Sequence, residues 1–232
     1  MTGKPRTIRT CDSGAAKQAQ QFEGLARVAP HPALGLRAVR FCLAEPRLFL
    51  TQLRAILRAT HYGNVRILIP MLASVSEIDQ TLVLIARAKE TLREQGVPFD
   101  AGVKVGGMIE IPAAVLSISA FLRKHDFLSI GTNDMIQYTL AVDRSAEAVA
   151  HLDYPLHPTV LRTMGLARGS APRVLAGRGR SRSADNERTS GVREKLAQER
   201  LLCRTPVLDP RCSERQRTKI AAQDLFDSLW HE

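Results

Sequence analysis

Residues 127–134 read FLSIGTND, an apolar run followed by a glycine and then by polar side chains. The run from Phe127 to Ile130 predicts a short buried strand. Gly131 allows the backbone to turn sharply where that strand ends. Asn133 and Asp134 are therefore expected at the carboxyl edge of a strand.

A second strand end of this kind lies upstream. Residues 103–109 predict a strand that runs into Glu110, and a helical pattern follows over residues 113–122. Glu110 and Asp134 would then take equivalent positions on neighbouring parallel strands. Two converging carboxylates repel each other unless a cation lies between them, and hard oxygen ligands favour magnesium or manganese. Arg144, ten residues after Asp134, could pair with a carboxylate or a phosphate of a ligand.

Each of these residues also has a simpler interpretation when it is taken alone. A strand-end aspartate such as Asp134 is often a helix N-cap. A glutamate close before a proline, as Glu110 is before Pro112, is often a solvated loop residue. The metal-site hypothesis therefore depends on the surrounding sequence as well.

Strand and helix patterns alternate through the first two thirds of the chain. Strands are predicted at residues 6–10 and 65–69, and a helix at 46–60 whose inner face carries Phe49, Leu53, Ile56 and Leu57. A capping box predicts a second helix to about residue 95, with an inner stripe of apolar side chains. The capping pair is Ser74 and Glu77, and the stripe is Ile78, Leu82, Ile85 and Ala86. This alternation predicts an α/β fold with a parallel sheet.

Four stretches of the sequence together resemble a known family. They are residues 9–17 (RTCDSGAAK), 32–40 (PALGLRAVR), 106–114 (GGMIEIPAA) and 129–144 (SIGTNDMIQYTLAVDR). The set closely resembles the phosphoenolpyruvate-binding barrel of enzyme I of the bacterial sugar phosphotransferase system, a member of the PEP-utilising enzyme family. The resemblance begins near Gly3 and runs to about Met164.

The resemblance implies a partial TIM (β/α)8 barrel over residues 1–165. It also implies a phosphotransferase that passes the phosphoryl group of phosphoenolpyruvate to a protein histidine, with Mg²⁺ as cofactor. Cationic groups on the phosphate and on the developing enolate suit that chemistry. By this resemblance, Glu110 and Asp134 are metal ligands, Asn133 and Arg144 hold the substrate, Arg9 and Arg37 surround its phosphate, and Lys17 falls on the family's lysine in the same loop. Without the resemblance, Arg9 would be interpreted as a surface arginine and Arg37 as a helix residue that reaches water.

Three parts of the family pattern are not found in this sequence. They are the phosphoacceptor histidine domain, the first barrel strand with its phosphate-binding arginine, and the cysteine of a Cys-Gly-Glu-Leu phrase that donates a proton to the enolate. Cys203 and Cys212 lack matching flanks, so no catalytic residue is assigned. We expect the acceptor to be a histidine phosphocarrier protein or a separate histidine-bearing domain. A non-catalytic remnant, or a partner that pairs through the barrel as a homodimer, stays open as the alternative.

Composition changes beyond residue 165. Residues 166–232 are expected to form a divergent, poorly structured tail, either disordered or the product of a shifted reading frame, with a last helical pattern at 219–230. Its arginines supply much of the net charge of +10. A basic nucleic-acid-binding protein is therefore the third hypothesis, although it rests on composition alone and is not the preferred one.

Length and the remaining composition are those of a cytoplasmic protein. The chain has 232 residues, and a complete barrel of eight units needs about 250. Only about 160 residues follow the barrel pattern, so roughly five or six strand-and-helix units are expected. No apolar run predicts a membrane span or a signal peptide. The 4 cysteines have no regular spacing and suit a reducing compartment.

Overall fold

The computed structural model describes residues 5–12, 33–144, 146–169 and 174–176. The elements follow one another in the order β1 (Arg6–Arg9), α2 (Ala38–Ala44), α3 (Pro46–Thr60), β2 (Val65–Ile69), α4 (Val75–Glu94), β3 (Lys104–Ile109), α5 (Pro112–Leu116), α6 (Ile118–Lys124), β4 (Phe127–Ile130), α7 (Thr132–Leu140), η1 (Ala150–Leu152), α8 (Pro158–Gly169) and β5 (Val174–Ala176).

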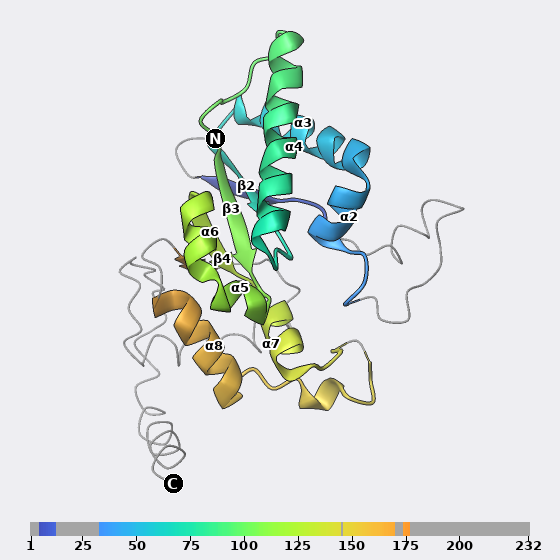
Figure 1. Cartoon of the computed structure of the whole chain (residues 1–232), viewed down its shortest axis with the longest axis vertical. Helices are drawn as coiled ribbons and strands as arrows, with labels where there is room; N and C mark the ends of the chain where they lie inside the picture. The colour runs from blue at the N-terminus through green and yellow to red at the C-terminus, as the bar shows by residue number, and fades with distance from the viewer. Residues whose placement is uncertain (1–4, 13–32, 145, 170–173, 177–232) are drawn as a thin grey trace, which may run out of the picture.

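The five strands form one sheet in which every neighbouring pair is parallel. The spatial order, β1-β2-β3-β4-β5, is also the order of the chain. Consecutive units of a β/α barrel have this topology, whereas an open doubly wound sheet reverses its strand order. In Figure 1 the strands run through the middle of the molecule, with α3 and α4 near one end and α8 near the other. The predicted α/β fold with a parallel sheet is confirmed.

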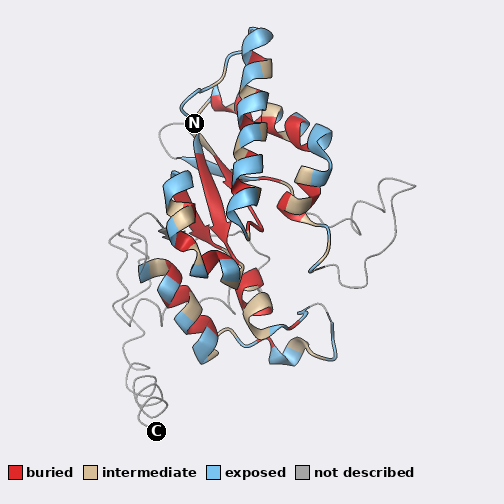
Figure 2. Ribbon diagram, in the orientation of Figure 1, coloured by how far each residue is buried: buried red, intermediate tan, exposed pale blue. Residues whose placement is uncertain are grey.

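Burial is greatest at the centre of the sheet. All of β4 is buried, and so is β3 after Lys104, whereas β1 is mostly exposed. Figure 2 shows the central strands in the colour of buried residues and exposed residues on the outer sides of the helices. The carboxyl ends of β2, β3 and β4 are thus part of the buried interior, which is where the candidate site lies.

Local sequence patterns predicted three elements with correct bounds. The helix α3 and the strands β2 and β4 begin and end at the predicted residues. The four apolar residues predicted for the inner face of α3 are all buried. Their spacing of three and four residues places them on one stripe of a helix.

The helix predicted over residues 113–122 is divided into α5 and α6. The break is at Ser117, which has φ −107° and ψ 20°. The Ser117 hydroxyl donates a hydrogen bond to the Ala113 carbonyl at 2.7 Å. A serine that bonds back to the preceding turn competes with the regular backbone ladder, and helices bend or end at such positions.

The inner stripe predicted for α4 was wrong at one position. Ala86 is exposed, and the buried residues are Ile78, Thr81, Ile85, Ala88 and Leu92. Thr81 can lie on the inner face because its hydroxyl donates to the Glu77 carbonyl at 2.7 Å. A buried hydroxyl with a hydrogen-bond partner costs little.

The capping box at the start of α4 is confirmed, and its contribution to stability can be measured. The Ser74 hydroxyl accepts from the Glu77 amide at 3.2 Å, and a Glu77 oxygen accepts from the Ser74 amide at 3.0 Å. Replacing Ser74 by Ala leaves the Glu77 amide without its partner, so we expect a loss of about 1 kcal/mol in the free energy of unfolding. Urea titration measures it. Ser76→Ala is the control because Ser76 lies in the same turn without capping the helix; an equal loss in both variants would contradict the assignment.

Several predictions concern residues outside the described ranges. They include Lys17, the helix expected at 219–230 and most of the expected basic tail. Helix α8 continues across the expected boundary at residue 165 as far as Gly169. Within the described ranges, no helix is both long and apolar enough to cross a membrane.

Candidate functional site

The candidate site lies at the carboxyl ends of four neighbouring parallel strands. Arg9 is the last residue of β1, Glu110 directly follows β3, and Asp134 lies in the first turn of α7, after β4. The carboxyl ends of parallel strands share one edge of a sheet, which is where side chains from distant parts of the sequence meet. Glu110 and Asp134 are buried, with exposed fractions of 2% and 7%.

The strand register corrects one expectation. Ile109 of β3 pairs with Ile130 of β4. The residue that lies opposite Glu110 in this register is therefore Gly131. Asp134 comes three residues later and reaches the site from helix α7. The two carboxylates therefore do not occupy equivalent strand positions, although they approach the same site.

Gly131 makes room for the Glu110 side chain. A Cβ atom at Gly131 would lie 2.8 Å from the Glu110 Cβ and 3.0 Å from the Met108 sulfur, with a Glu110 carboxylate oxygen still closer. Any other residue at position 131 would displace Glu110 or the strand. The glycine thus serves close packing as well as the turn predicted for it.

The protonation state of Glu110 depends on its burial and on a hydrogen bond from a backbone amide. Its Oε1 accepts a hydrogen bond from the Met71 amide at 2.6 Å. Met71 has φ 60°, in the left-handed region that is costly for a non-glycine residue. Burial and the neighbouring Asp134 carboxylate together raise the pKa of Glu110 to about 8, although the Met71 hydrogen bond acts to lower it. The carboxylate form of Glu110 thus lacks sufficient positive charge around it.

Arginines neutralise Asp134. Arg37 Nη2 lies 3.3 Å from Oδ2 of Asp134, and Arg144 Nη2 lies 3.8 Å from Oδ1. The same Nη2 of Arg37 donates to Oδ1 of Asp12 at 2.8 Å. Burial alone would lower the pKa of Arg37, but the Asp134 and Asp12 carboxylates outweigh it and the pKa is raised. Arg37 therefore stays charged.

Asp12 connects two of the predicted arginines. Its Oδ2 lies 2.9 Å from Arg9 Nη1, and its Oδ1 accepts from Arg37. The Arg9 side chain is half exposed, so its guanidinium is open to a ligand. Asp12 had not been assigned a role from the sequence, although an acidic residue three positions after Arg9 was a usable signal. Tyr138, which contacts Arg37, was missed in the same way.

The structure brings together most of the predicted site residues. Arg37, Asp134 and Arg144 are in direct contact. Glu110 is close enough to Asp134 for the two charges to interact. Asn133 lies half-buried in the same turn of α7 as Asp134. Lys17 is outside the described residues.

The donor set fits a hard divalent cation. Two buried carboxylates face one site, and the raised pKa of Glu110 reflects a negative charge that a cation would stabilise. Among the described residues, no group of three or more histidine, cysteine, aspartate or glutamate side chains could hold a metal ion. Magnesium is commonly held by one or two carboxylates, with water and phosphate oxygens as the other ligands. Glu110 and Asp134 match that pattern.

The raised pKa of Glu110 predicts a pH-dependent stability without metal. The unfolded chain loses this proton near the usual 4.5, whereas the folded chain keeps it until about pH 8. Wild type therefore loses stability as the pH rises from about 4.5 to about 8. Glu110→Gln cannot ionise, so we expect its stability relative to wild type to increase through this window and then level off.

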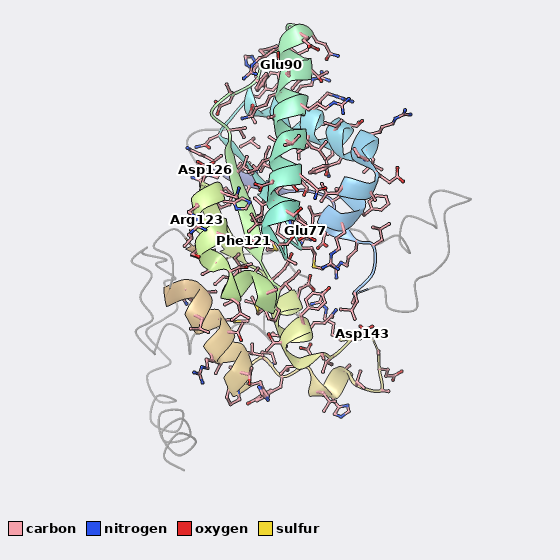
Figure 3. All side chains as sticks on the ribbon, in the orientation of Figure 1. Glu77, Glu90, Phe121, Arg123, Asp126 and Asp143 are labelled. Atoms are coloured by element: carbon pink, nitrogen blue, oxygen red, sulfur yellow. The ribbon has the colours of Figure 1, made fainter. Side chains whose placement is uncertain are left out.

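Thermal unfolding in a chelator at several pH values measures this difference between variant and wild type. Glu90→Gln is the control because Glu90 is an exposed residue on α4; Figure 3 labels it at the end of α4 opposite to Glu77. If the difference in stability between Glu110→Gln and wild type does not change with pH, then burial does not raise the pKa of Glu110.

Comparison with known proteins places this site in context. Residues 1–171 match the family model described as PEP-utilising enzyme, PEP-binding domain. A phosphoenolpyruvate-protein phosphotransferase of Cupriavidus necator is 63% identical over 162 residues, which are 70% of this chain and 28% of that protein. Proteins with the same name from Listeria monocytogenes and Bacillus subtilis are 44% and 42% identical, over 70% and 72% of this chain and 28% and 29% of their own lengths. The chain therefore spans less than a third of these relatives.

One solved structure that matches this chain is a citrate lyase from Burkholderia xenovorans. Its TM-score is 0.42 at 17% sequence identity, and the match covers 84% of this chain and 71% of that one.

Proposed function

The chain belongs to the PEP-utilising enzyme family, and from this premise we propose that it binds phosphoenolpyruvate together with Mg²⁺ as the substrate-binding part of a phosphoenolpyruvate-protein phosphotransferase. The observation that carries the proposal is a pair of buried carboxylates, Glu110 and Asp134, with arginines on the side of the sheet where the strands end. Relatives that bear this name support the substrate.

The formal charges of the site explain why metal and substrate should bind together. Three guanidinium groups, those of Arg9, Arg37 and Arg144, stand beside three carboxylates, those of Asp12, Glu110 and Asp134. When Glu110 is ionised, as a metal ligand must be, three positive and three negative charges sum to zero, so these six side chains then offer no net attraction for an anion. A bound Mg²⁺ would add two positive charges and would polarise the phosphate and enolate oxygens of the substrate. Phosphoenolpyruvate binding is therefore expected to depend on the metal.

Each residue has a proposed part in substrate binding. Glu110 and Asp134 hold the metal ion. Arg9 and Arg37 face the phosphate, and Arg144 with Asn133 orients the carboxylate end of the substrate. Lys17 is proposed near the phosphate from the family resemblance alone. These residues bind and orient, which is the main contribution a protein makes to phosphoryl transfer.

The acceptor is proposed to be a histidine outside this set of residues. In the transfer, the bond between phosphorus and the enol oxygen breaks and a bond from phosphorus to an imidazole nitrogen forms. The enolate that is released takes up a proton to give pyruvate. A histidine phosphocarrier protein or a separate histidine-bearing domain would supply the imidazole.

Calorimetric titration of the folded chain with phosphoenolpyruvate, with and without Mg²⁺, tests the proposal. Circular dichroism first establishes that the chain is folded. We expect binding that requires Mg²⁺ and is competed by excess chelator. A folded chain that shows no binding in the presence of Mg²⁺ would refute the proposal and favour a remnant without ligand binding.

A further inference from the structure

Tyr138 is placed to control Arg37 from helix α7. It lies four residues after Asp134, so the two side chains occupy the same face of the helix. The Tyr138 hydroxyl accepts a hydrogen bond from Arg37 Nη1 at 3.3 Å, and it donates one to the Ala33 carbonyl. These contacts join residues that are 101 and 105 positions apart in the sequence.

We propose that Tyr138 is a positioning residue, which holds the Arg37 guanidinium toward the substrate phosphate once Asp134 is engaged with the metal. The inference rests on the proposed function and adds to it a residue that needs to touch neither metal nor substrate. Tyr138 should therefore affect how tightly the chain binds phosphoenolpyruvate, and it should not affect how tightly the chain binds the metal.

The geometry of Arg37 shows why such a residue is needed. Both carboxylates that contact Arg37, Asp12 and Asp134, lie against one nitrogen, Nη2. If Asp134 directs its oxygens toward a metal ion, Arg37 loses one of these two partners. Tyr138 acts on the other nitrogen, Nη1, so its hold on the guanidinium does not depend on the state of Asp134.

The second hydrogen bond of Tyr138 fixes the backbone that carries Arg37. Ala33 lies four residues before Arg37, and the next residue after Arg37, Ala38, has φ 49° and is fully buried. A left-handed conformation is unfavourable for an alanine and persists only where the surroundings impose it. Tyr138 thus holds both the side chain of Arg37 and the segment before it.

Burial keeps the Tyr138 hydroxyl able to donate. It raises the pKa of Tyr138 above its usual value, against the opposing effect of the Arg37 charge. The hydroxyl therefore keeps its proton at neutral pH, donates to the Ala33 carbonyl and accepts from Arg37 at the same time.

Tyr138→Phe tests the proposal because it removes the hydroxyl and keeps the ring. In the presence of Mg²⁺, we expect the affinity for phosphoenolpyruvate to fall about 3- to 10-fold, because one of the two hydrogen bonds that are lost holds Arg37. The affinity for Mn²⁺ alone, used as the metal probe, should remain at the wild-type value. Tyr62→Phe is the matched control, since it removes a hydroxyl from an exposed tyrosine.

A double-mutant cycle separates positioning from a general structural role. Arg37→Lys keeps a positive charge but has no second nitrogen for the hydroxyl to hold. Tyr138→Phe should therefore have a clearly smaller effect on phosphoenolpyruvate affinity in the Arg37→Lys background, where only the bond to Ala33 remains to be lost. Full additivity there, or wild-type affinity in Tyr138→Phe alone, would overturn the inference while leaving the proposed function in place. Failure of wild type to bind phosphoenolpyruvate would overturn both.

Discussion

Replacing Asp134 by Asn is expected to reduce Mg²⁺-dependent binding of phosphoenolpyruvate by about 100-fold or more, because the proposed metal ligand changes from a charged group to a neutral one of the same shape. Glu110→Gln should have a similar effect. Both changes keep the side-chain volume, so the buried packing around positions 110 and 134 is preserved. Stability should change as well, because Glu110→Gln cannot ionise and Asp134→Asn loses its ion pairs with Arg37 and Arg144. Affinity is therefore compared only after circular dichroism shows that each variant is folded. Calorimetry at several Mg²⁺ concentrations measures it.

The control for these variants is Asp79→Asn. Asp79 is a half-exposed aspartate that forms an ion pair with Lys124 on the surface. It carries the same chemical change away from the site, and a surface ion pair contributes little to stability. Metal-dependent binding that survives in both Asp134→Asn and Glu110→Gln would show that these carboxylates are not the metal ligands.

Replacing Gly131 by Ala should damage both folding and binding. The added Cβ would lie 2.8 Å from the Glu110 Cβ, which is fixed to the backbone and cannot rotate away. Overpacking of this kind costs roughly 1–3 kcal/mol. We expect a decrease of about that size in the free energy of unfolding, measured by urea titration, together with weaker Mg²⁺ binding because Glu110 is displaced.

Gly63→Ala provides the comparison for Gly131→Ala. A Cβ at Gly63 would meet no atom within 4 Å, so this variant should have nearly wild-type stability. Equal stability of the two variants would mean that Glu110 does not approach Gly131 as closely as the structure indicates.

Local patterns in the sequence were sufficient for much of the fold. The bounds of α3 and β2 and the capping box of α4 follow from spacing and from residue type over short windows. The break at Ser117 could not be predicted in this way, since it depends on how one hydroxyl bonds to the preceding turn. The same holds for the buried Thr81, whose hydroxyl has an internal partner.

The candidate site was predictable in part. Its residues converge because each follows a parallel strand, and the sequence places Glu110 and Asp134 after such strands. The contacts of Asp12 and Tyr138 with Arg37 join positions 25 and 101 residues apart. No local pattern encodes such pairs, so their roles emerge only from the folded chain. The metal and substrate roles themselves stay predictions.

Because the site is assembled from four separate strand ends, ligand binding is coupled to folding. The unfolded chain has no means of holding Arg37, Glu110 and Asp134 together, so a ligand that uses all three binds the folded state alone. Such a ligand stabilises the protein in proportion to the logarithm of its concentration above the Kd. In the described part of the chain the sheet ends at β1, a mostly exposed strand, so the concentration of such a ligand would then influence how long each molecule survives proteolysis.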